Sequence, residues 1–219
     1  SRATLETWLK RYREEAGAEQ ALVLAGGVPT VAGEFTSAID LLKTGLFDQL
    51  GFKRLHVAGH PEGNKDIDPK GGTKVVDEAL MWKQGFSQQT DAEMAIATQF
   101  AFEAGPIIAW AEGLKREGIT LPIHIGIAGP AKLQTLIKFA IACGVGPSLK
   151  VLQKRAMDVS KLLLPYEPTD VLTALANYNA GNPDSNIAQV HFFPLGGIKT
   201  NAQWASDNGG AAAQPANPS

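Results

Sequence analysis

The chain has 219 residues, of which 44% are hydrophobic, and a formal net charge of −2 from 20 basic and 22 acidic side chains. This length and apolar content suffice for the core of one α/β domain. The near balance of charge gives no general attraction to nucleic acid or to an anionic membrane, so we expect neither as a partner.

The single cysteine, Cys143, excludes an intrachain disulfide framework or a cysteine-based metal cluster. It lies in an apolar helical run and is predicted to be a small buried hydrophobe. No apolar run approaches the roughly 20 residues that span a bilayer, and no secretory signal is found at Ser1. We therefore expect a cytoplasmic protein, with a disordered tail over residues 206–219.

Helical patterns and short apolar strands alternate along the chain. The first helix is predicted from an apolar stripe that comprises Leu5, Trp8, Leu9 and Tyr12. Five apolar runs, rich in branched residues and ending in polar or glycine-rich turns, are typical of parallel strands covered on both faces; they are 20–25, 56–58, 94–97, 122–125 and 190–193. Such an alternation predicts a parallel sheet whose carboxyl ends share one rim, where α/β proteins bind ligands.

The segment 56–64 is the most informative of these strand ends, because the strand runs directly into a polar turn. Pro61 fixes its own φ, while Gly59 and Gly63 permit conformations and close approaches that a Cβ would block. The turn is therefore predicted to present a defined polar array, namely His60, Glu62 and Asn64. The alternative is an ordinary strand-to-helix loop whose polar residues face water.

Five strands leave the architecture open between two forms. A (β/α)₈ barrel needs eight strands and typically uses about 250 residues. One interpretation is an α/β TIM-barrel type of fold over residues 1–205, covering strands four to eight, with the N-terminal strands expected before Ser1 or supplied by a partner segment or homo-oligomer. The other is a complete five-stranded open sheet.

Several strand-end segments carry a family resemblance. Ala58-Gly59-His60-Pro61-Glu62 is similar to an Ala-x-Tyr/His-Pro-Glu motif, and Thr98-Gln99-Phe100 to a Thr-Gln-x-Phe motif. Gly126-Ile127 before a helix carrying Phe139, and the strand 191–193, add support. Over about residues 1–205 the chain thus resembles the methylenetetrahydrofolate reductase family, flavoenzymes built on a (β/α)₈ barrel.

The resemblance implies that FAD passes a hydride from NAD(P)H to methylenetetrahydrofolate, giving methyltetrahydrofolate. It assigns cofactor contacts to Gly26, Gly27, Thr36, Ser37, His60, Glu62, Asn64 and Lys83. It assigns folate contacts to Gln99, Thr135 and Phe139. An amide such as that of Gln99 can donate and accept hydrogen bonds in one plane, which suits a pterin edge.

Simpler roles remain open for several of these residues. Ser37 is also a good N-cap for the helix that follows it. Phe139 could pack in the core, and Lys83 could be a surface lysine. The strand histidines His56, His124 and His191 are expected to be buried with satisfied ring nitrogens, so no metal site is predicted.

The chain also departs from the family. The usual Arg-Gly-Asp after the fourth strand is Ala25-Gly26-Gly27, and the usual Leu-Asn-Arg after the last strand is Leu195-Gly196-Gly197, so an aspartate near the flavin and a cation that fixes folate are missing. Lys199 could replace that cation only in part. The family's general acid is expected before Ser1, so no catalytic residue is assigned. The alternative functions are a flavin-free barrel subunit that binds folate or another small ligand, and an inert fragment of the reductase.

Overall fold

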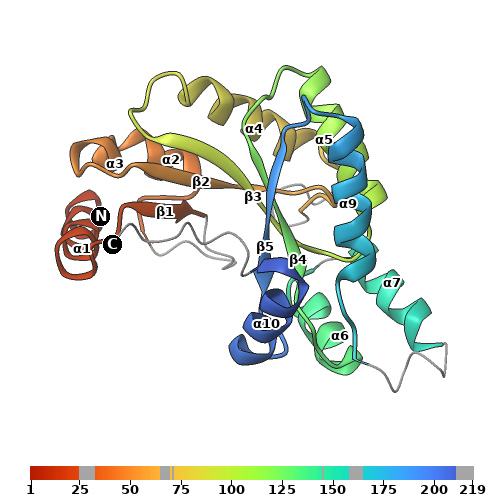
Figure 1. Cartoon of the computed structure of the whole chain (residues 1–219). Coiled ribbons are helices and arrows are strands. Elements are labelled where there is room, and N and C mark those ends of the chain that lie inside the picture. Colours follow the sequence, from red (N-terminus) through yellow and green to blue (C-terminus); the bar gives the residue numbers. More distant parts are fainter. Residues whose placement is uncertain (25–32, 65–69, 71, 145, 158–164, 211–219) are drawn as a thin grey trace, which may run out of the picture. The chain divides into compact units, whose positions relative to one another are not determined.

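The computed structural model describes residues 1–24, 33–64, 70, 72–144, 146–157 and 165–210. It is a mixed α/β fold with a five-stranded parallel sheet flanked by helices, in which the strands follow one another in chain order (Figure 1). The strands are β1 Gln20–Val23, β2 Arg54–Gly59, β3 Glu93–Ala101, β4 Ile123–Ala128 and β5 Ile187–Phe193. The five predicted strands and their parallel order are thus confirmed.

The helices occupy the connections between strands, as the alternating pattern predicts. They are α1 Arg2–Ala16, α2 Ala38–Lys43, α3 Leu46–Gln49, α4 Lys74–Phe86, α5 Ala104–Arg116, α6 Leu133–Ala142, α7 Gly146–Ala156, α9 Thr169–Gly181 and α10 Ile198–Ala205. A π turn, Ser206–Gly210, follows α10 at the start of the predicted tail, whose remaining residues, 211–219, lie outside the described part of the chain. No helix in the described ranges combines the length and the apolar character that crossing a bilayer would need.

The chain divides into two compact units, whereas the sequence prediction treats residues 1–205 as one domain. The first unit comprises Ser1–Gln99, Pro106–Ile125 and Asn182–Gln189. The second comprises Phe100–Gly105, Gly126–Gly181 and Val190–Ser219. The strands β3, β4 and β5 each give their first residues to the first unit and their last residues to the second.

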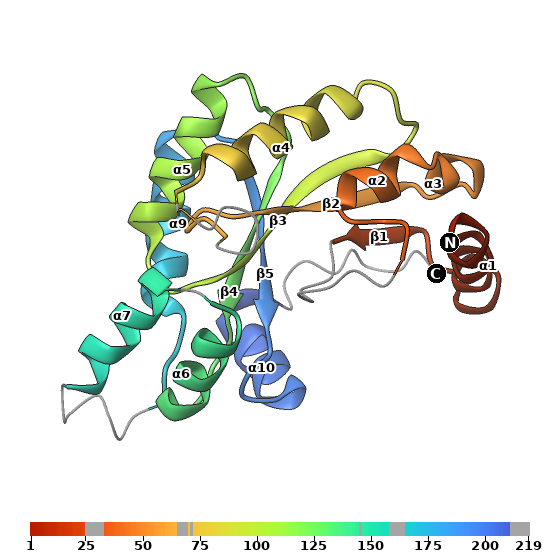
Figure 2. The ribbon, with the colours of Figure 1, turned by 180° about the vertical axis from the view of Figure 1, so that it is seen from behind.

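In the first unit, β2 has one buried and one half-exposed face. Leu55, Val57 and Gly59 are buried, and they alternate with half-exposed residues that include His56 and Ala58. The helices α2 and α4 lie on one side of β1 and β2 in both views (Figures 1 and 2). A strand of a parallel sheet is expected to be covered on both faces. For β2 this expectation is wrong, because its second face carries polar side chains that remain within reach of solvent.

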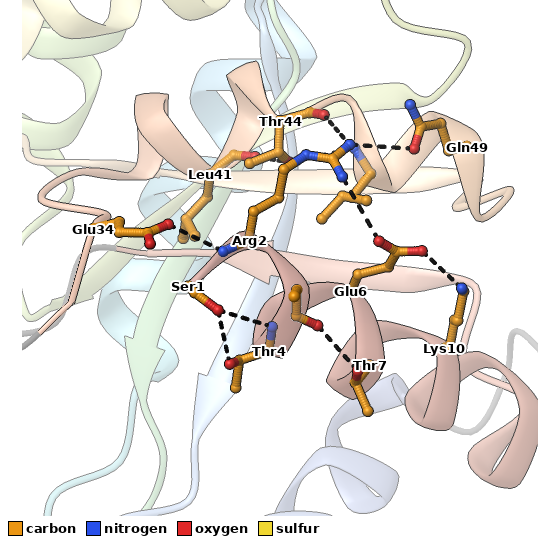
Figure 3. A network of polar contacts seen from close by, with 12 residues as sticks. Ser1, Arg2, Thr4, Glu6, Thr7, Lys10, Glu34, Leu41, Thr44 and Gln49 are labelled. Atoms are coloured by element: carbon orange, nitrogen blue, oxygen red, sulfur yellow. Dashed lines mark hydrogen bonds and ion pairs between the residues drawn. The ribbon is translucent and has the colours of Figure 1, made fainter.

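The start of α1 is fixed by a polar network (Figure 3). Ser1 caps the helix by accepting a hydrogen bond from the Thr4 backbone at 3.3 Å. The backbone N–H of Arg2 donates to the Glu34 carboxylate at 3.1 Å, and its guanidinium donates to the Thr44 carbonyl at 3.2 Å. These exposed contacts orient α1 against the segment around α2, although each contributes little to stability.

The predicted apolar stripe of α1 is only partly a packing face. Leu9 is buried, but Trp8 is 57% exposed and stacks on Tyr12 with 5.2 Å between ring centroids. The Trp8 and Tyr12 rings therefore cover part of each other's apolar surface by stacking and are not buried against the sheet.

The core of the second unit is built from aromatic rings and the apolar face of α6. Phe102 packs edge-on against Phe100 at 5.8 Å and against Tyr166 at 5.2 Å between centroids. The α6 residues buried in this cluster are Leu133, Leu136 and Ala140. Cys143 is exposed, and its predicted burial is wrong, because it forms the C-cap of α6 beyond the last buried turn.

Candidate functional site

A tight turn follows β2, at the predicted strand end. The Gly63 N–H donates to the His60 carbonyl at 2.9 Å, and Gly63 has a φ of 74°, in the left-handed region that favours glycine. A Cβ on Gly63 would overlap the Gly72 carbonyl oxygen, and one on Gly59 would lie 2.8 Å from Trp110. The predicted requirement for both glycines is confirmed, and the turn holds His60 in a fixed position.

His60 and Gln99 each follow a residue of the last pair of β2 with β3. In the parallel register of β2 and β3, Gly59 pairs with Thr98, so His60 and Gln99 are the next residues of the two segments. Because side chains alternate between faces along a strand, Gln99 falls on the half-exposed face with Ala97, while His60 follows the last residue of β2. The sequence motifs that come from separate segments therefore meet at one edge.

The end of β3 was predicted at Ala97 and is in fact Ala101. The segment Thr98–Phe100 lies within the strand, with Thr98 and Phe100 buried and Gln99 half-buried. Similarly, Gly126 belongs to β4. The polar residues Thr98 and Gln99 suggest a strand end, but the buried Thr98 hydroxyl donates to the Gln99 carbonyl at 3.0 Å and Gln99 lies on the half-exposed face, so the strand continues through both.

Lys83 is buried, with only 7% of its surface exposed, so its alternative assignment as a surface lysine is wrong. It lies on α4, and its Nζ donates to the Ala58 carbonyl at 3.5 Å, one residue beyond the last pairing of β2 with β1. Burial lowers the pKa of Lys83 to about 8. The amine is thus mainly protonated at neutral pH and close to its titration point.

His60 lies within the electrostatic influence of this amine. Burial lowers the pKa of His60, and the positive charge of Lys83 lowers it further, while the negative charge of Asp77 opposes them. His60 is therefore favoured in its neutral form, in which one ring nitrogen donates a hydrogen bond and the other accepts one.

Asp77, in the first turn of α4, completes this polar group and had no recognisable sequence motif. Its Oδ1 atom is buried and has no hydrogen-bond partner among the described residues. A buried carboxylate oxygen without a partner is costly, and such atoms are often found where a ligand or water binds. In the sequence, Asp77 is an ordinary acidic residue near a helix start.

Thr36 and Ser37 form the N-terminal cap of α2. The Asp40 carboxylate accepts hydrogen bonds from the Thr36 hydroxyl at 2.8 Å and the Ser37 N–H at 3.0 Å, and Ser37 Oγ accepts from the Asp40 N–H at 3.2 Å. These bonds, those from Thr36 first, lower the pKa of Asp40. The predicted cap is confirmed, whereas cofactor contact by these two residues stays a prediction.

The remaining predicted residues are distributed as follows. Thr135 and Phe139 share one face of α6, one helical turn apart, and belong to the second unit. Phe139 is 38% exposed, so the core-packing alternative is wrong. Glu62 and Asn64 are half-buried in the turn after β2, and Gly26 and Gly27 lie outside the described residues.

No protein-family model matches the chain. Across the described ranges, no three side chains of histidine, cysteine or acidic residues gather as ligands for a metal ion. The chemistry of the site is therefore argued from the group at the ends of β2 and β3, which consists of His60, Asp77, Lys83 and Gln99.

Replacing Gly63 by alanine tests the turn. Because a side chain at φ 74° is strained and its Cβ would overlap the Gly72 carbonyl, Gly63→Ala should lower the free energy of unfolding by about 1–2 kcal/mol or more. Gly85→Ala is the control, since Gly85 lies in α4 with open space around it, and should leave stability equal or slightly higher. Equal urea midpoints for Gly63→Ala and the unmodified protein would contradict this geometry.

Replacing Lys83 by methionine tests the buried amine. Between pH 8 and its ordinary pKa of 10.5, Lys83 binds fewer protons in the folded than in the unfolded state, so stability should rise with pH across this window, by up to about 3 kcal/mol. Lys83→Met should abolish this rise and be more stable at pH 7, as measured by urea unfolding.

The exposed Lys74 on the same helix gives the matched control. Lys74→Met should retain the rise in stability between pH 8 and 10.5. A rise of equal size in Lys83→Met would show that Lys83 is not the group that titrates.

Proposed function

We propose that the chain is a flavin-dependent reductase of the methylenetetrahydrofolate reductase type, using FAD and NAD(P)H, and that its parallel sheet is part of a (β/α)₈ barrel. In this proposal the ends of β2 and β3 bind the flavin, and folate lies against Gln99. The protein acts in the cytoplasm, alone or as a homo-oligomer.

One observation carries the proposal. Two short motifs, 58–62 and 98–100, resemble the same family, and the pairing of Gly59 with Thr98 brings both motifs to the same end of neighbouring strands. Nothing in the spacing of the two motifs along the chain requires this meeting. Ligand sites of parallel α/β folds lie at this end of the strands.

Small side chains precede these residues on the half-exposed face of β2 and β3. Ala58 pairs with Ala97, two residues before His60 and Gln99, and both alanines are half-buried. In this proposal the planar ring of the flavin lies over these two alanines, beside the amide of Gln99. A flavin bound there would supply the hydride chemistry.

His60 and Lys83 would then have separate tasks. A neutral His60 exchanges hydrogen bonds with an uncharged ring without adding a charge to it. Protonated Lys83 supplies a positive charge behind the turn, which favours an anionic part of the cofactor. The buried Oδ1 of Asp77 offers an acceptor for a ring N–H or a hydroxyl.

A flavin-free barrel subunit that binds folate or another small ligand is the second candidate. The glycines after β5 favour it, because Gly197 has a φ of 109° and a Cβ on Gly196 would overlap the Pro130 carbonyl oxygen. This backbone accommodates glycine and disfavours the family's asparagine and arginine. The cation that fixes folate in the family thus has no equivalent at this position.

The spectrum of the purified protein distinguishes the two candidates. A reductase should carry, or bind on addition, one FAD with an oxidised-flavin spectrum that bleaches when NADH or NADPH is added anaerobically. Colourless protein that binds a folate but no FAD would favour the flavin-free subunit.

The two half-reactions test the role of Gln99. Because the amide is proposed to contact the pterin and not the nicotinamide, Gln99→Ala should slow reoxidation of the reduced flavin by methylenetetrahydrofolate by about 10- to 100-fold, the loss typical of one directed hydrogen bond, and leave reduction by NAD(P)H within about two-fold. Stopped-flow absorbance measures both steps. Gln203→Ala, an exposed glutamine on α10, is the control and should change neither step. Equal losses in both half-reactions would contradict the assignment.

A further inference from the structure

Two strand histidines of the first unit meet on the open face of the sheet, away from the group around Lys83. His56 on β2 pairs in register with Ala95 on β3, and His124 lies on β4, the next strand. The small side chain of Ala95 lets the two rings approach across it. The distance between His56 Nε2 and His124 Nδ1 is 3.0 Å.

The relative orientation of the rings is informative. A straight hydrogen bond of this length, directed along both ring axes, would separate the ring centroids by about 5.3 Å. The centroids are 4.8 Å apart and the ring planes are inclined by 56°. The ring axes are therefore tilted away from the line that joins the two nitrogens.

Two nitrogens bound to one metal ion have this separation. With bonds of about 2.0–2.1 Å at roughly a right angle, two imidazole nitrogens lie about 3 Å apart, with each ring axis directed at the ion and not at the other nitrogen. The His56–His124 pair therefore needs little movement to bind a metal ion.

A third polar group converges on the same point. The side-chain amide of Gln189 on β5 lies 2.9 Å from His124 Nδ1, which is also 3.0 Å from His56. One ring nitrogen has a single proton or a single lone pair, so it cannot form two strong hydrogen bonds at once. When the side-chain amide of Gln189 turns by about 180°, its oxygen and nitrogen exchange places, and the oxygen then lies at this position. His56 Nε2 and the Gln189 side chain thus both lie within 3.0 Å of His124 Nδ1.

The site is open to ions from solution. His124 and Gln189 line an open cavity of about 460 Å³, together with Arg54 and Glu93 at the amino ends of β2 and β3. Arg54 and Glu93 form an exposed ion pair at 2.8 Å, so the nearby charges balance. Water from this cavity can complete the coordination of a bound ion.

We propose that His56 Nε2, His124 Nδ1 and the Gln189 side-chain oxygen bind one divalent ion of the late first-row transition metals. Neutral imidazole nitrogens with an amide oxygen favour Cu²⁺, then Ni²⁺ or Zn²⁺, over Mg²⁺ or Ca²⁺. The site is separate from the proposed flavin site, since His60 is four residues further along, about 13 Å for an extended strand.

Titration of the metal-free full chain with CuSO₄ and with NiCl₂, followed by calorimetry, tests the proposal. One ion should bind per chain, with weaker affinity below about pH 6 as the imidazoles become protonated. His56→Gln and His124→Gln should each weaken binding by more than about ten-fold, the loss that even outer partners of a ligand can cause. His60→Gln removes another of the four histidines and should leave the affinity unchanged.

Two further measurements separate the loss of a metal ligand from the loss of the fold. The electron paramagnetic resonance spectrum of the Cu²⁺ form should show coupling to two imidazole nitrogens, and only one in either variant of the pair. Circular dichroism verifies that each variant is folded, and Gln189→Leu provides a variant that leaves both rings in place and should weaken binding less. Absence of binding, or equal binding in His56→Gln, His124→Gln and His60→Gln, would overturn the proposal.

Discussion

The parallel register of β2 with β3 is the constraint on which the candidate site depends. Pairing of Gly59 with Thr98 brings His60 and Gln99 to the same end of the two strands, although 39 positions separate them in the sequence numbering. A shift of one residue in β3 would turn Gln99 to the buried face. Trp110 packs against Gly59 so closely that no Cβ fits at this last position of β2.

Two buried polar groups near the end of β2 lower the stability of the folded chain. The amine of Lys83 is buried with a pKa lowered to about 8, and the buried Oδ1 of Asp77 has no hydrogen-bond partner in the described part of the chain. Polar groups in these states cost folding free energy, and proteins retain them most often where a ligand is bound. The position of these groups at the end of β2 and their cost in folding free energy both favour a ligand site there, in the first unit.

Much of the fold could be predicted because it depends on local patterns. The five strands, the cap at Ser37 and the need for glycine at Gly59 and Gly63 all follow from residue types at short spacing. The burial of Lys83 could not be predicted, because it depends on how α4 lies against β2. The meeting of His56 with His124 likewise depends on strand order and on the small size of the residue between them.

The central claim is that a planar cofactor binds across the ends of β2 and β3. The most direct measurement is the change in backbone amide and side-chain NMR signals of the labelled chain when FAD is added. The account predicts saturable shifts at His60, Gln99 and Lys83, with Glu93 at the opposite end of β3 unchanged. Saturable shifts confined to other residues, or none at any FAD concentration, would contradict it.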